Sequence, residues 1–190
     1  MIGTIICIAH RGGGEGVFEN RRETIKKTLQ NKLIDAIEID LRCTKDGVLV
    51  AHHDRGVYIN GDRVWIDKVE FASMKHLGIP RFEEILLLTE ASGKILNIDV
   101  KDENCIDPLV QFFKKKPSKQ KIYFDCFNLD VLLRLEEELD NGEYYLSLTL
   151  KDSRDLNRRF FVRMIALLGS IFFSRIILFL LRRRVKEVKV

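Results

Sequence analysis

Short apolar runs alternate with helix-compatible segments over residues 4–150, and this alternation limits the possible folds more than any other feature. The runs have the length and apolar character of buried strands, and they are Thr4–Ala9, Ala36–Leu41, Val48–His52, Ile95–Val100, Ile122–Phe127 and Tyr144–Leu150. The helix-compatible segments are Glu23–Lys32, Phe82–Ala91, Ile106–Lys115 and Leu129–Leu139. Such alternation indicates an α/β fold, in which helices cover a parallel sheet that is either open or closed into a barrel.

Charge is distributed unevenly along the chain. The net charge is +4, but residues 156–190 alone carry +8, so the preceding residues carry −4. Apolar residues make up 46% and charged residues 32% of the chain, which is typical of a globular protein. An acidic body argues against nucleic acid as its partner, whereas the basic tail could contact an acidic surface.

The four cysteines lie far apart and form no CxxC pair. We therefore expect small buried side chains in a reducing compartment. The chain enters its first apolar run almost at once, without a signal peptide, so we expect a cytoplasmic location.

The segment of residues 156–190 is apolar and basic, and three interpretations of it stay open. A membrane-spanning helix would bury Arg163 and Arg175, each at about 2.5–3.5 kcal/mol near the bilayer centre. A buried helix and strand could instead complete the sheet. A helix at the membrane surface would place Arg182–Arg184 beside acidic headgroups.

Ionisable residues stand at the ends of the predicted strands. Glu38 and Asp40 end one strand, and Asp99 ends another. Because the carboxyl ends of parallel strands share one edge of the sheet, these carboxylates are expected to meet there. Hard oxygen ligands without a nearby cysteine favour Mg²⁺ or Ca²⁺, and a metal would offset the repulsion between the carboxylates.

Cations and histidines stand at the same expected edge. Arg11 and Lys101 could hold a phosphate. His10 follows the first strand and His53, with Asp54, follows Val48–His52; both titrate near neutral pH. Each element alone is more often structural, but together they favour a metal-dependent phosphoryl-transfer site.

These residues belong to a series of motifs with a known order and spacing. The motifs are His10-Arg11-Gly12, Phe18-Glu19-Asn20, Glu38-Ile39-Asp40, Thr44-Lys45-Asp46-Gly47, His53-Asp54 and Asn97-Ile98-Asp99-Val100-Lys101. In this respect residues 4–150 resemble the glycerophosphodiester phosphodiesterase family.

The resemblance implies a (β/α)8 barrel of the TIM type and a metal-dependent hydrolysis of glycerophosphodiesters to glycerol phosphate and an alcohol. It implies that His10 and His53 are the general acid–base pair and that Arg11 and Lys101 contact the phosphate. It also implies that Glu38, Asp40 and Asp99 bind Mg²⁺ or Ca²⁺. Glu19 and Asn20 would belong to a supporting loop.

The sequence also departs from the family pattern. Asp99 replaces the usual Glu, Phe18 replaces a Pro, and nothing after Leu150 matches the late strands of the family. We therefore expect a C-terminally shortened or irregular barrel over residues 1–155, followed by the apolar, basic segment 156–190. Two alternatives stay open: a catalytically weak homologue that associates with a membrane or a partner chain through this segment, and an enzyme that acts on lysophospholipids.

Overall fold

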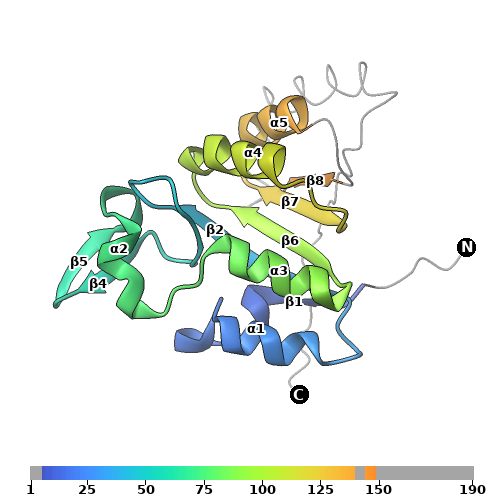
Figure 1. Ribbon diagram of the computed structural model, residues 1–190, viewed down its shortest axis with the longest axis horizontal. Coiled ribbons are helices and arrows are strands. Elements are labelled where there is room, and N and C mark those ends of the chain that lie inside the picture. Colours follow the sequence, from blue (N-terminus) through green and yellow to red (C-terminus); the bar gives the residue numbers. More distant parts are fainter. Residues whose placement is uncertain (1–5, 140–143, 149–190) are drawn as a thin grey trace, which may run out of the picture.

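The structure, a computed structural model, describes residues 6–139 and 144–148. Its centre is a six-stranded sheet with the order β1-β2-β6-β7-β8, in which β3 pairs with β2 outside this path (Figure 1). Neighbours along the path are parallel. The strands are β1 (Ile8–Ala9), β2 (Ala36–Cys43), β3 (Leu49–Ala51), β6 (Ile95–Val100), β7 (Ile122–Cys126) and β8 (Tyr144–Leu148). Within the described residues the sheet is open between β1 and β8.

The longer helices cover one face of this sheet and follow the order of the strands (Figure 1). They are α1 (Arg22–Leu29), α3 (Phe82–Ser92), α4 (Ile106–Lys115) and α5 (Leu129–Glu138). The predicted bounds of α4 are confirmed, and those of α3 and α5 differ by one residue. The first helix ends at Leu29 rather than Lys32, because the backbone turns there toward β2.

The strands separate apolar from polar side chains by their two-residue period. On β6, Leu96, Ile98 and Val100 are buried, whereas Asn97 and Asp99 alternate with them and are half-buried. The apolar side chains therefore pack under the helices, and the polar ones occupy the opposite face of the sheet.

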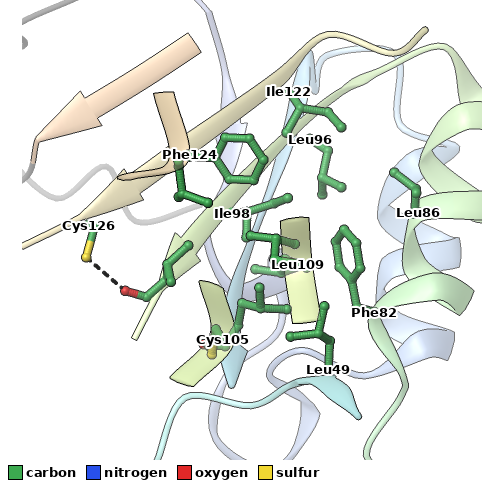
Figure 2. Close-up of a cluster of buried hydrophobic side chains, with 14 of the residues drawn as sticks. Leu49, Phe82, Leu86, Leu96, Ile98, Cys105, Leu109, Ile122, Phe124 and Cys126 are labelled. Carbon is green, nitrogen blue, oxygen red and sulfur yellow. Dashed lines mark hydrogen bonds between the residues drawn. The ribbon is translucent and has the colours of Figure 1, made fainter. Parts of the chain in front are cut away.

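Figure 2 shows the core between sheet and helices. Ile98 and Phe124, from adjacent strands, lie beside Phe82 of α3 and Leu109 of α4, and all four are at most 1% exposed. Burial of such side chains contributes roughly 1.5–3 kcal/mol each. The four cysteines are free. Three of them, Cys43, Cys105 and Cys126, are buried as expected, but Cys7 is exposed, so the expectation of burial is wrong for this residue.

A small two-stranded hairpin follows His53 and Asp54 in the chain. Its strands are β4 (Gly56–Ile59) and β5 (Asp62–Trp65), which pair antiparallel. It packs with the short helix α2 (Phe71–Met74) around a second apolar cluster. That cluster consists of Val50, Val57, Ile66, Met74 and Ile79.

The strand predicted over Val48–His52 forms as β3, but it runs antiparallel to β2. The expectation that His53 stands at the end of a parallel strand, like the other site residues, is therefore wrong. The physical reason is the short Thr44–Gly47 turn, because a parallel connection needs a crossover of a dozen or more residues. His53 instead reaches the edge of the sheet on a strand that returns along β2.

Residues 156–190, and with them the predicted boundary at residue 155, lie outside the described residues. Among the helices of the described part of the chain, none has the length and apolar character needed to cross a membrane.

Candidate active site

Glu38, Asp40 and Asp99 come together where β2 and β6 run side by side. Glu38 and Asp40 are two residues apart on one strand and so share a face. Asp40 lies opposite Asp99 in the register of the two strands. One carboxylate oxygen of each residue lies within 4.8 Å of the others. Glu38 and Asp40 are buried, whereas Asp99 is half-buried.

The two cations expected at the site lie beside these carboxylates. Lys101 Nζ is 2.7 Å from Oδ1 of Asp40 and forms a second ion pair with Asp99. Arg11 Nε is 3.7 Å from Oδ2 of Asp40, and Arg11 Nη1 is 2.9 Å from Oε2 of Glu19. The positive charges of Arg11 and Lys101 thus offset the mutual repulsion of the carboxylates.

The pKa values of Glu38 and Asp40, both on β2, are shifted in opposite directions. Burial, followed by the nearby charge of Asp40, raises the pKa of Glu38 to about 8. Burial alone would also raise the pKa of Asp40, but hydrogen bonds from Lys101 and Asn20 outweigh it and lower this pKa. Near neutral pH the cluster therefore keeps Asp40 ionised and leaves Glu38 able to hold a proton.

The loop after β1 brings its backbone against the carboxylates. Arg11 and Gly12 have φ angles of 51° and 72°, in the left-handed region. A Cβ on Gly12 would lie 2.5 Å from Cγ1 of Ile25 in α1, so only glycine fits. The resulting turn lets the backbone N–H of Arg11 donate to Oε2 of Glu38 at 2.5 Å.

The predicted supporting loop contacts the same cluster. Asn20 is 1% exposed, and its Nδ2 donates to Oδ2 of Asp40 at 2.8 Å. Its Oδ1 accepts from the backbone N–H of Asp40 at 3.2 Å. The backbone N–H of Asn20 also donates to the carbonyl of Arg11 at 2.9 Å. Asn20 therefore ties the loop after β1 to the centre of β2.

Both predicted catalytic histidines lie near Asp40 and interact with its charge. His10 Nε2 is 3.9 Å from Oε2 of Glu38, and the ring is largely exposed. Partial burial, followed by the charge of Arg11, lowers the pKa of His10. His53 Nδ1 is 2.9 Å from Oδ1 of Asp54, whose carboxylate orients the ring.

The donor set suits a hard divalent cation. Its three carboxylates supply only oxygen ligands, the kind preferred by Mg²⁺ and Ca²⁺. Oδ1 of Asp99 is buried and accepts no hydrogen bond from the described residues, so it remains available as a ligand. Glu38, Asp40 and Asp99 are thus the residues that would hold such an ion.

Sequence reasoning missed two charged residues beside the site. Arg42 follows Glu38 and Asp40 on the same face of β2, and its guanidinium contacts the backbone of His53 and the side chain of Asp102. The two-residue spacing from Asp40 was a signal that could have revealed Arg42. No local pattern pointed to Asp102, because its partner lies 60 residues away.

Solved structures of the same architecture exist. A glycerophosphodiester phosphodiesterase from Thermotoga maritima matches with a TM-score of 0.67 and 22% identity, over 87% of this chain and 71% of that chain. A phosphodiesterase from Oleispira antarctica, solved with the product sn-glycerol-3-phosphate, matches with a TM-score of 0.65 and 19% identity. That match covers 92% of this chain and 84% of that chain. These likenesses show an α/β fold of the phosphodiesterase barrel type, as predicted.

Sequence comparison then defines the family. The family model described as "Glycerophosphoryl diester phosphodiesterase family" matches residues 10–170, and the chain belongs to this family. A curated relative from Caldanaerobacter subterraneus, named glycerophosphodiester phosphodiesterase, is 27% identical over 143 residues, or 65% of this chain. The chain spans 37% and 58% of the length of the two curated relatives that it matches.

Proposed function

We propose that this chain hydrolyses glycerophosphodiesters to glycerol phosphate and an alcohol, with the help of Mg²⁺ or Ca²⁺. The observation that carries the proposal is the gathering of Glu38, Asp40 and Asp99 within 4.8 Å, in a chain that belongs to the phosphodiesterase family. The product complex of the Oleispira antarctica relative supports a substrate with a glycerol phosphate group.

In the proposed reaction the cations bind the phosphate and the histidines transfer protons. Arg11 and Lys101 would bind the phosphoryl oxygens, and the divalent cation would neutralise the charge that develops on them. One histidine would take the proton from the attacking glycerol hydroxyl, and the other would protonate the leaving alcohol. The cyclic phosphate that results would then be opened by water.

The contact with Asp54 supports a base role for His53. Its Nδ1 lies 2.9 Å from the Asp54 carboxylate, which favours a proton on that nitrogen. Nε2 is then left as the proton acceptor, so that His53 can act as the general base. His10 would act as its acid counterpart.

The test is hydrolysis of a soluble glycerophosphodiester by the full chain with Mg²⁺ or Ca²⁺, and with EDTA. We expect activity that EDTA removes and that His10→Ala and His53→Ala each lower by about 10²–10⁴-fold. His76→Ala is the matched control, because His76 lies in the 3₁₀ turn Lys75–Leu77 and has no role in the proposed site. A folded wild-type chain without such activity would refute the proposal.

One observation favours lysophospholipids as a second substrate class. Val17 and Phe18 are 75% and 64% exposed, and they directly precede Glu19 in the loop that supports the site. Exposed apolar side chains beside a site can contact an acyl chain. If they do, Phe18→Ser lowers the hydrolysis of a micellar lysophospholipid and leaves that of a soluble diester unchanged.

We also propose that the phosphodiesterase-like part of the chain ends near residue 155, that the protein is cytoplasmic and that residues 156–190 contact a membrane surface. The family match extends to residue 170, beyond the proposed boundary at residue 155. The free cysteines support a reducing, cytoplasmic location. A flotation assay with acidic vesicles tests the membrane contact. The full chain should float with the vesicles, and a chain without residues 156–190 should not.

A further inference from the structure

The guanidinium of Arg42 joins two loops at the edge of the site. Its Nε and Nη2 both donate to the carbonyl oxygen of His53, at 2.9 Å and 2.7 Å. Its Nη1 donates to Oδ2 of Asp102 at 2.5 Å. The side chain of Arg42 is only 11% exposed, so these contacts are shielded from water. A planar guanidinium with several donors suits this double contact better than any other side chain.

The segment that carries His53 depends on this contact. The strand β3 ends at Ala51, and the next backbone N–H, of His52, donates to the carbonyl of Asp40 at 2.9 Å. Beyond it, the carbonyl of His53 is held by Arg42. The backbone on both sides of the His53 side chain is thus attached to β2, the strand that also carries two of the clustered carboxylates.

Asp102 fixes the direction of the guanidinium. It follows Lys101 directly in the chain, at the end of β6. Because Asp102 binds Nη1, the remaining donors of Arg42 point toward His53. Arg42 therefore connects the loop after β6, with Lys101, to the loop after β3, with His53.

We propose that Arg42, oriented by Asp102, is the positioning residue that sets the place of the His53 imidazole relative to the carboxylates. The inference rests on the proposed function. Arg42 acts through the backbone of His53 and need not touch the substrate. A displacement of about 1 Å of a reacting group can cost about 10²-fold in rate, so the loss of this contact has a large effect on catalysis.

Arg42→Lys is the variant of choice, because it keeps the charge but cannot reproduce the paired N–H donors. We expect kcat to fall by about 10²-fold, while KM and the affinity for Mg²⁺ stay close to those of the wild type. Asp102→Asn, which leaves Arg42 in place, gives a smaller fall of about tenfold with the same pattern. Arg134→Lys is the matched control, since Arg134 lies exposed on α5 and pairs with Asp107.

A second readout does not depend on activity. The chain has four histidines, so the imidazole resonances of each can be followed by NMR in histidine-labelled protein. We expect Arg42→Lys to shift or broaden those of His53 and its neighbour His52, and to leave those of His10 and His76 unchanged.

The outcomes separate this inference from the proposed function. Unchanged kcat with unmoved His53 resonances would overturn it. A parallel loss of thermal stability, Mg²⁺ affinity and kcat would also overturn it, because Arg42 would then hold the fold rather than one residue. If the wild type hydrolyses no diester, the proposed function fails, and the imidazole resonances alone decide the role of Arg42.

Discussion

Asp40 and Asp99 lie directly opposite each other on adjacent parallel strands, and one ammonium group, Nζ of Lys101, contacts an oxygen of each. Two carboxylates that face each other on paired strands repel each other unless a cation lies between them. The stability of the fold and the affinity of the site for a divalent cation are therefore linked through the same side chains.

We expect Lys101→Met to destabilise the protein by about 3–5 kcal/mol without a divalent cation, because it leaves buried carboxylates without their partner. Added Ca²⁺ should raise the thermal midpoint of the variant more than that of the wild type, since a ligand stabilises the state to which it binds. Thermal unfolding with and without Ca²⁺ measures both effects. Lys116→Met, at an exposed ion pair with Glu83, should have little effect.

The length of the side chain at residue 99 should set the strength of cation binding. We expect Asp99→Ala to weaken Ca²⁺ or Mg²⁺ binding by roughly 10–100-fold or more, because a ligand is removed. Asp99→Glu keeps the charge and restores the longer residue that is usual in the family, so its affinity should equal or exceed that of the wild type. Isothermal titration calorimetry decides between these results, and equal binding by Asp99→Ala would rule out this residue as a ligand.

Glu38 should make the stability of the metal-free protein depend on pH. The pKa of Glu38 is raised from 4.5 to about 8, so the folded state holds its proton more tightly than the unfolded state. Its contribution to stability is fully present below pH 4.5 and is lost as the pH rises through about 8. Urea unfolding in EDTA between about pH 5.5 and about pH 8.5 should show this fall. Glu38→Gln, which cannot ionise, should remove most of it, whereas an unchanged slope would contradict the assignment.

Gly12 should tolerate no side chain. We expect Gly12→Ala to cost about 2–5 kcal/mol, because its Cβ would collide with Ile25 at 2.5 Å and because φ is +72°. Gly47→Ala is the matched control: φ is +79° there, but nothing lies within 4 Å of the added atom. It should cost only about 1–2 kcal/mol. Urea unfolding of both variants separates the steric effect from the backbone effect, and equal costs would contradict this account.

Local sequence patterns were enough for much of the fold. The two-residue period of β2 and β6 predicted which side chains share a face, because a strand alternates them whatever its surroundings. The pattern of α4, Ile106–Lys115, predicted its bounds for a similar reason, since Pro117 soon follows its last residue. The same period places Glu38 and Asp40 on one face, and Asp99 was grouped with them because the carboxyl ends of parallel strands share one edge of the sheet.

Pairing between distant segments was decided only by the tertiary structure. The antiparallel return of β3 brings His53 to the site, and the contact from Arg42 to His53 and Asp102 joins residues 11 and 60 positions apart. Local periodicity predicts neither contact, because it indicates only which side of a strand or helix is buried. The sequence by itself thus determined the chemical groups and the faces that carry them, whereas the packing of strands against one another determined which groups meet.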